Sequence, residues 1–196
     1  MSGQEKDETA QLAQLFGARV AVLQPDAIDG LAAAAVRQRL EAKGYARYPG
    51  IDRGSYEFLD EPTEAVIGAV GKPLLATLQA AASAATGRSL ALALATPASP
   101  AVRALRLGAG DYLLAHHDRD SDDGTVELTL DLSASVSEGA GVVYLRGGKP
   151  FFHLPSQPGA LAIVERDASV RCHHAYLSKR FPAAQVVRLV VRLRPA

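Results

Sequence analysis

The hydrophobic positions of this chain follow two different periods, one in its first 88 residues and another in the rest. In the first part, apolar residues recur every three or four positions, which is typical of helices with one buried face. We expect one helix over residues 26–43, capped by Asp26 and ended by Gly44. A second helical region is expected over residues 64–85, with a break at residues 71–73, which contain a proline. The apolar stripe of the first helix would comprise Ile28, Leu31, Ala32, Ala35, Val36 and Leu40.

From residue 89 onward, short segments rich in Val, Leu and Thr alternate with Gly, Pro, Asp and Ser, which predicts strands separated by turns. The expected strands cover residues 90–95, 102–107, 111–117, 126–132, 142–145, 151–154, 161–164, 170–177 and 186–193. Helices followed by a long antiparallel run indicate an α+β chain, mostly β, folded as a barrel or two-sheet jelly roll with helices on one side. We expect a single domain with a flexible tail over residues 1–10, helical support over 11–88 and a jelly-roll core over 89–196.

The composition is that of one domain with a sizeable core: 196 residues, 48% hydrophobic, with 21 basic and 21 acidic residues. This balance predicts no nucleic-acid partner, and no apolar run is long enough to predict a membrane span. The polar start of the chain lacks the pattern of a secretory signal, and a single cysteine, Cys172, fits a reducing compartment. We therefore expect a cytoplasmic protein. The sequence does not indicate an oligomeric state.

All five histidines fall between residues 116 and 174, as two doublets and a lone His153. On a strand, His116 and Asp118 would project from the same face. Two imidazoles and one carboxylate, with the remaining coordination positions open, suit a non-haem Fe(II) that activates oxygen. In the second doublet, alternation groups His174 with Cys172 and places His173 on the other face. We take His174 as the third ligand and His173 as the alternative, because a bulge would reverse the alternation.

Another candidate is Arg188. Over residues 187–193 the odd positions are all apolar and are expected to lie under the helices, so that Arg188 and Val190 share the inner face of the barrel. A guanidinium that points inward needs an anion.

These residues together resemble the Fe(II)- and 2-oxoglutarate-dependent dioxygenases, in the prolyl-hydroxylase-like branch. The motif of that family is His-x-Asp, a distal His far downstream and an Arg a little beyond it. Residues 107–113 (Leu-Gly-Ala-Gly-Asp-Tyr-Leu) are also similar to the glycine-aromatic segment that precedes the first ligand, and residues 139–143 and 158–163 to internal turns and strands. The resemblance runs from about residue 90 to the C-terminus. Residues 126–133 depart from the pattern, since they lack the Arg and Tyr often found there.

The resemblance implies a double-stranded β-helix, the jelly-roll or cupin-like barrel. It implies that His116, Asp118 and His174 hold Fe(II), and that Arg188 binds the far carboxylate of the cosubstrate 2-oxoglutarate through two charge-assisted hydrogen bonds. Tyr112 would hydrogen-bond the cosubstrate or the substrate. With dioxygen as the other reactant, the implied reaction is hydroxylation of an unactivated C–H bond in a small molecule, an amino acid or a specialised metabolite. Desaturation and ring closure are the alternative outcomes of the same chemistry.

Three other functions fit the same residues. A cupin-like isomerase or binding module would hold a metal without oxygen chemistry, a protein-residue hydroxylase would share the chemistry but not the substrate, and a non-catalytic relative would have lost the site. Each candidate residue also has a purely structural interpretation. His116 and Asp118 could be a surface pair beside the acidic turn at residues 118–124, and Tyr112 and Cys172 could be ordinary core residues.

Overall fold

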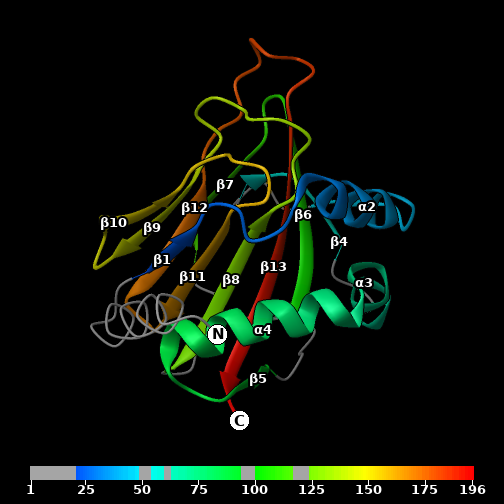
Figure 1. Ribbon diagram of the computed structural model, residues 1–196. Coiled ribbons are helices and arrows are strands. Elements are labelled where there is room, and N and C mark those ends of the chain that lie inside the picture. The colour runs from blue at the N-terminus through cyan, green and yellow to red at the C-terminus, as the bar shows by residue number, and fades with distance from the viewer. Residues whose placement is uncertain (1–20, 49–53, 60–62, 94–99, 117–123) are drawn as a thin grey trace.

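The computed structural model describes residues 21–48, 54–59, 63–93, 100–116 and 124–196. Within these residues the chain is mostly β, with two antiparallel sheets and three helices (Figure 1). The larger sheet has the order β1 (Val22–Gln24), β11 (Leu161–Arg166), β8 (Thr125–Asp131), β13 (Gln185–Pro195), β6 (Val102–Gly108), β4 (Glu57–Leu59) and β2 (Ala46–Arg47), with β5 (Leu90–Leu92) also paired to β13. The smaller sheet has the order β10 (Lys149–Leu154), β9 (Val142–Arg146), β12 (Val170–His174), β7 (Tyr112–His116) and β3 (Gly54–Ser55).

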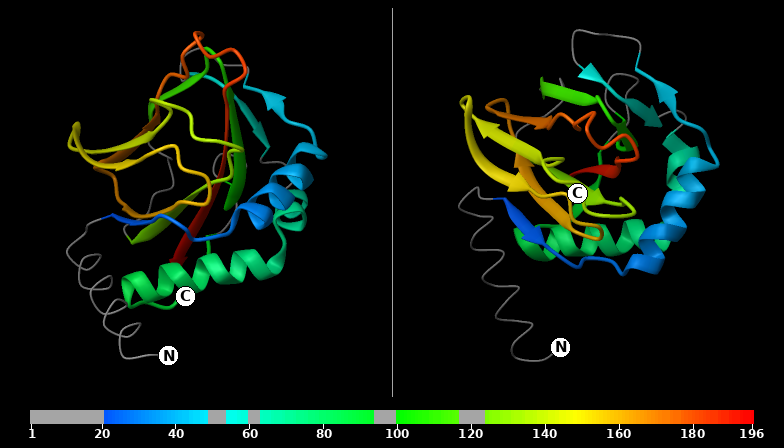
Figure 2. Two further views of the ribbon diagram at one scale, coloured as in Figure 1. Left: turned by 45° about the horizontal axis from the view of Figure 1, so that its top comes forward. Right: turned by 90° about the horizontal axis from the view of Figure 1, so that it is seen from above.

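The helices cover one face of the larger sheet, and the smaller sheet lies toward its other face (Figure 2). They are α2 (Gly30–Glu41), α3 (Thr63–Val70) and α4 (Lys72–Thr86). Beneath them, Leu40 and Leu78 pack in one buried cluster with Leu128 of β8 and Leu189 of β13. The odd-numbered residues of β13 from 187 to 193 all belong to this cluster. The expectation that these positions lie under the helices is therefore confirmed.

The opposite face of the larger sheet points into the space between the sheets, and on β8 it is polar. On β8 this face carries Thr125, Glu127, Thr129 and Asp131, all at most 5% exposed. Arg166 of β11 donates to both carboxylate oxygens of Glu127 at 2.9 Å, and the hydroxyl of Tyr144, from the smaller sheet, lies 3.1 Å from Glu127 and 2.9 Å from Thr129. Buried polar groups are stable only when they are paired. This network therefore fixes β8, β9 and β11 relative to one another.

The first helix differs from its prediction in start and in orientation. Asp29, not Asp26, is the cap, and its carboxylate accepts a hydrogen bond from the backbone N–H of Ala32 at 2.8 Å. The residues before the cap form a turn, in which the N–H of Ala27 bonds to the carbonyl of Gly159. The predicted stripe is wrong in part, because Leu31 is 86% exposed. The buried residues of this helix are Ala33, Val36 and Leu40.

The second helical region and its break are confirmed as α3 and α4, and each expected strand has a counterpart. The strand expected over residues 170–177 ends earlier, at His174, and residues 94–95 of the strand expected over 90–95 lie outside the described residues. Four strands in the first part of the chain, β1 to β4, were not predicted. They have only two or three residues each, too few for a period to be visible in the sequence.

No single helix in the described ranges is long and apolar enough to cross a membrane. Together α3 and α4 pass that test by length and composition, but they meet at a bend of 89° and contribute buried residues to the core.

Two leucines of α2 give a matched test of the helix layer. We expect Leu40→Ala to lower the free energy of unfolding by about 2–5 kcal/mol, because it removes a fully buried side chain and leaves a cavity. Leu31→Ala, in the same helix, should change it by less than about 0.5 kcal/mol. Urea denaturation followed by circular dichroism measures both. Equal effects would show that α2 is not docked through the face described.

Candidate functional site

The smaller sheet brings the two histidine doublets to neighbouring strands. In the register of β7 with β12, His116 lies opposite Cys172, and Leu113 lies opposite His174. Between these two pairs the register shifts, so that three residue steps on β7 match two on β12. Regular alternation is therefore wrong as a prediction between residues 113 and 116. Leu114, expected to share the face of His116, is 49% exposed. Residues 117 and 118 lie outside the described residues. The bulge places both His116 and Leu113 opposite residues of the inner face of β12.

On β12 the two histidines of the second doublet face opposite ways. His174 is 3% exposed, whereas His173 lies on the outer face, where it and His153 of β10 are both register partners of Val143. Burial and the neighbouring His153 lower the pKa of His173. The face expected for His174 is thus the one observed. Its role as a metal ligand remains a prediction.

Arg188 reaches into the same interior from β13, and it is 1% exposed. Its Nη1 lies 3.0 Å from Nδ1 of His174, and its Nη2 donates to the carbonyl oxygen of Ala140. Its Nε has no hydrogen-bond partner among the described residues. The carboxylate nearest in register is that of Asp131, which accepts bonds from the backbone N–H groups of Ser133 and Gln157 at 2.8 and 3.1 Å.

The guanidinium of Arg188 is therefore a buried cation whose two hydrogen-bond acceptors are neutral. Burial lowers its pKa, and the charge of Asp131 opposes this shift only in part. A buried guanidinium that donates only to neutral acceptors favours the binding of an anion, and it suits a carboxylate in particular. The inner face predicted for this arginine is confirmed by its contact with His174.

The same contact decides which ring nitrogen of His174 carries the proton. A guanidinium has donors and no acceptor, so Nδ1 of His174 must accept, and the neutral ring then carries its proton on Nε2. A histidine that binds a metal presents a lone pair at one nitrogen and donates from the other. The pair as described fits a carboxylate at Arg188, whereas His174 fits a metal only after its proton changes position.

The other predicted ligands are only partly described. The backbone of His116 belongs to β7, but its side chain, His117 and Asp118 lie outside the described residues. Within the part of the chain that the structure describes, no three His, Cys, Asp or Glu side chains are grouped closely enough to hold a metal. Tyr112 is half-buried and neighbours Leu113, which packs inward. Because adjacent strand residues face opposite ways, Tyr112 is expected to face away from the side on which Leu113 packs. Its role as a contact of cosubstrate or substrate remains a prediction.

Asp111, which precedes β7, is a structural residue of the site that we did not predict. Its carboxylate accepts bonds from Arg47 at 2.6 and 3.0 Å, from the Ser55 hydroxyl at 2.9 Å and from the Gly108 N–H at 2.9 Å. Its backbone carbonyl accepts from the N–H of Leu177, 2.9 Å away in the segment that follows β12. It thereby links the start of β7 to the chain after His174.

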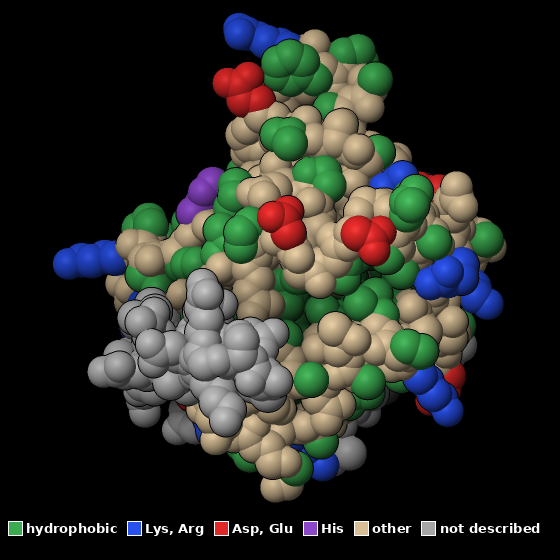
Figure 3. All heavy atoms as spheres, in the orientation of Figure 1, with side chains coloured by type: hydrophobic (Ala, Val, Ile, Leu, Met, Phe, Trp, Pro, Cys, Tyr) green, Lys and Arg blue, Asp and Glu red, His purple; other side chains and the backbone are tan. Residues whose placement is uncertain are grey.

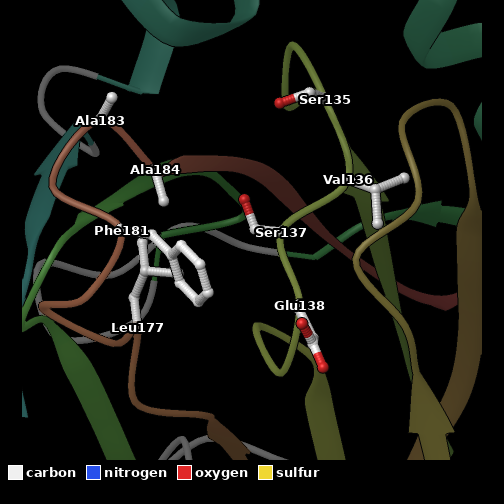
Figure 4. Close-up of a pocket in the computed structure, with 8 residues that line it drawn as sticks. All are labelled: Ser135, Val136, Ser137, Glu138, Leu177, Phe181, Ala183 and Ala184. Carbon is white, nitrogen blue, oxygen red and sulfur yellow. The ribbon is translucent and has the colours of Figure 1, made fainter.

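A cavity of about 390 Å³ lies between the loop that follows β8 and the loop that follows β12 (Figure 4). It is lined by Ser135, Val136, Ser137, Glu138, Leu177, Phe181, Ala183 and Ala184. A small buried cluster of Ala140, Leu177 and Val186 adjoins it, and Ala140 is also the residue whose carbonyl binds Arg188. The cavity is therefore connected to Arg188 through Leu177, which lines it, and the Ala140 that packs in the same cluster as Leu177.

Large apolar side chains are exposed on these two loops. Val136 is 70%, Tyr176 52% and Phe181 49% exposed. In the space-filling view, hydrophobic side chains gather at the upper end of the molecule, where the loops lie (Figure 3). Exposed apolar residues around a cavity are typical of a surface that binds a ligand or a partner.

No protein-family model and no curated protein sequence matches this chain. Solved structures do match it. The non-haem α-ketoglutarate-dependent epimerase SnoN from nogalamycin biosynthesis has a TM-score of 0.70 at 15% identity, over 97% of this chain and 83% of that one. A second SnoN structure, in complex with Fe3+, α-ketoglutarate and nogalamycin RO, has a TM-score of 0.67 at 14% identity, over 97% and 84% of the two chains.

Two further solved structures match this chain. A 2OG-Fe(II) oxygenase family protein from Burkholderia pseudomallei has a TM-score of 0.66 at 14% identity, over 95% of this chain and 89% of that one. A prolyl hydroxylase from Trichoplax adhaerens, in complex with a peptide of hypoxia inducible factor, has a TM-score of 0.65 at 10% identity, over 97% and 91%. The resemblance to Fe(II)- and 2-oxoglutarate-dependent oxygenases is therefore confirmed at the level of the fold.

The hydrogen bonds to Asp111 predict a pH dependence of stability. Burial alone would raise the pKa of this carboxyl, but the bonds from Arg47, Gly108 and Ser55 outweigh burial and lower it below the ordinary value of 3.8. A carboxyl whose pKa is lower in the folded state stabilises the fold above its unfolded pKa and loses this effect as the pH falls through the folded value. We expect Asp111→Asn to be less stable than the wild type at pH 7, and the difference to shrink below about pH 4. Thermal melts from pH 7 to pH 3 measure this, and a constant difference would contradict it.

Proposed function

We propose that this protein is an Fe(II)- and 2-oxoglutarate-dependent oxygenase that hydroxylates an unactivated C–H bond of a small molecule. The single observation that carries the proposal is the buried guanidinium of Arg188, which meets only neutral acceptors beside His174. The far carboxylate of 2-oxoglutarate would supply a charged acceptor for this guanidinium through a two-pronged hydrogen bond. The matching structures with 2-oxoglutarate as cosubstrate have the same fold.

The strand order supports a double-stranded β-helix as the scaffold. From β6 to β9 the chain alternates between the two sheets, β9 and β10 form a hairpin within the smaller sheet, and β11 to β13 alternate again. This arrangement stacks four strands of the chain on four others. A metal ligand on β7, another on β12 and the arginine on β13 would then converge between the sheets.

In the proposed site, His116, Asp118 and His174 hold the iron. His173 is the weaker alternative, because it lies on the outer face of the sheet. When bound, the iron and 2-oxoglutarate supply the chemistry, in which dioxygen is consumed, the keto acid becomes succinate and CO2, and one oxygen atom enters the substrate. Arg188 orients the cosubstrate, and the buried interior around His174 limits access of water. Tyr112 is kept as a candidate contact of cosubstrate or substrate.

The cavity favours a small-molecule substrate, an amino acid or a specialised metabolite. Its volume, about 390 Å³, falls within the range of roughly 300–1,000 Å³ that is usual for small-molecule pockets. SnoN, the match with a TM-score of 0.70, comes from the biosynthesis of a small molecule. The matching prolyl hydroxylase in complex with a peptide favours protein-residue hydroxylation as the second candidate. Incubation with candidate peptides, followed by mass spectrometry for a gain of one oxygen atom, distinguishes the two.

Anaerobic titration tests the central proposal. Fe(II) together with 2-oxoglutarate should give a weak visible metal-to-ligand charge-transfer band, because the keto acid chelates the iron. Fe(II) alone, or with succinate, should not give it. A cupin-like module that holds a metal without oxygen chemistry should show no band under any of these conditions, and that result would overturn the proposal.

Succinate release in air tests the ligand set. We expect the wild type to form succinate slowly without added substrate, and Asp118→Ala to lose this activity almost completely because one metal ligand is removed. Asp120→Ala, in the same acidic segment but outside the His-x-Asp spacing, is the matched control and should keep the wild-type rate. Equal rates for Asp118→Ala and the wild type would exclude Asp118 as a ligand.

A further inference from the structure

We propose that the cavity between the loops after β8 and β12 binds an amphipathic amine, with the apolar body of that molecule against the loop side chains and its cationic head at Glu138. The inference rests on the proposed function in one respect, since it takes the amine as the substrate that the oxygenase hydroxylates. It thereby names the chemical class of that substrate. The binding itself requires neither iron nor 2-oxoglutarate.

The wall formed by the loop after β12 is held in place by backbone hydrogen bonds. Leu177, which lines the cavity, accepts a bond from the N–H of Gly110 at 2.7 Å and donates one to the carbonyl of Asp111 at 2.9 Å. Further along the loop, the N–H of Ala184 donates to the carbonyl of Phe181 at 2.9 Å. A ligand therefore meets this wall already formed, which reduces the entropic cost of binding.

The wall formed by the loop after β8 is fixed in a similar way. The N–H of Ser137 donates to the hydroxyl of Ser156 at 3.1 Å, and the carbonyl of Ser137 accepts from the N–H of Ala140, also at 3.1 Å. Ser137 itself is 8% exposed. Both walls of the cavity thus have hydrogen-bonded backbone, as is usual for pockets that exist before the ligand arrives.

The lining of the cavity is mostly apolar. Figure 4 shows Leu177 and Phe181 on one side and Val136 on the other. The apolar side chains of Phe181 and Val136 are largely in contact with solvent, so a ligand that covers them removes apolar area from water, which is favourable. The body of the ligand is therefore apolar, and the cavity volume of about 390 Å³ limits it to a small molecule.

Glu138 gives the cavity its charge. Of the eight described residues that line the cavity, it is the one with an ionisable side chain, and Figure 4 shows it at the edge. The other polar side chains of the lining are the neutral hydroxyls of Ser135 and Ser137. A carboxylate binds an ammonium group through charge-assisted hydrogen bonds. The head group that complements this edge is therefore a cation.

Two basic residues follow in the loop after β12, but neither of them lines the cavity. Lys179 and Arg180 are both exposed, and the side chain of Lys179 packs against Gly110 in the turn before β7. The charge at the cavity itself is thus negative. It favours a cationic head group over a neutral or an anionic one, and contact with solvent keeps this preference moderate.

Methyl NMR of the full chain, with Leu177 and Val136 as reporters, tests the inference without iron or 2-oxoglutarate. The probes are phenylbutylamine, phenylbutanol and phenylbutanoate, which share one apolar body and differ in the charge of the head group. We expect the wild type to bind the amine about fivefold more tightly than the alcohol, the upper end for an exposed ion pair, and to bind the acid most weakly. Equal affinities for amine and alcohol, or no binding of the amine, would overturn the inference.

The variant Glu138→Gln removes the charge and keeps the shape of the side chain. We expect it to bind the amine and the alcohol equally, and to bind the alcohol as tightly as the wild type does. Glu64→Gln, which changes an exposed acidic residue of α3, is the matched control and should keep the preference of the wild type. If Glu138→Gln keeps that preference too, another group attracts the amine and the inference is wrong.

The variant Ala183→Trp tests the location of binding. Ala183 lines the cavity and is exposed, so a large side chain there occupies the cavity without entering the core. We expect all three probes to bind this variant more weakly than the wild type. Unchanged binding would show that the probes lie elsewhere, which contradicts the inference.

Succinate release in air, with Fe(II) and 2-oxoglutarate present, tests the link to the reaction. Saturating amine should change the rate of the wild type, because a molecule in the substrate site alters turnover at the iron. An unchanged rate would exclude the cavity as the substrate site.

The titrations also separate this inference from the proposed function. If the charge-transfer band appears but the amine has no advantage over the alcohol, the oxygenase assignment stands and only the substrate class is wrong. If the amine binds through Glu138 but no band forms, the proposed function is wrong, and the cavity is an amine site without a role in oxygenation.

Discussion

The buried cation of Arg188 is the constraint on which the site depends. It stands on β13, whose opposite face packs under the helices, so its position is fixed by the core of the larger sheet. From there it reaches His174 on the smaller sheet and the Ala140 carbonyl on the loop before β9. Arg188 thus links the larger sheet to His174 of the smaller sheet and to the loop before β9. A buried charge that donates only to neutral acceptors is costly, and an anion at Arg188 would lower this cost.

The sequence predicted the parts of this arrangement that follow from period alone. The apolar odd positions of residues 187–193 correctly placed Arg188 on the inner face, and the alternation of residues 170–174 correctly placed His174 there. The break between α3 and α4 followed from a proline, whose local effect needs no knowledge of the rest of the chain. Each of these predictions depends only on residues close together in the sequence, through strand alternation or the local effect of a proline.

Other features depend on partners that are distant in the sequence, and no local rule reveals them. The bulge of β7 appears only against the register of β12, and the start of α2 at Asp29 accompanies a backbone bond from Ala27 to Gly159. The cluster around Asp111 joins Arg47 and Ser55, which lie more than fifty residues earlier in the chain. The tautomer of His174 likewise follows from a contact with a residue on another sheet, and a sequence pattern carries no information about the protonation of a ring.

Two arginines in the same interior differ in the charge of their hydrogen-bond partners. Arg166 donates to both oxygens of a carboxylate, Glu127, which is itself buried and bonded to Tyr144. Such a pair is costly to break, because separation would leave two buried charges uncompensated. The acceptors of Arg188 are neutral, so an incoming carboxylate offers it a better bond than those it gives up. Arg166 is therefore paired with a carboxylate within the fold, whereas both hydrogen bonds of Arg188 go to neutral acceptors.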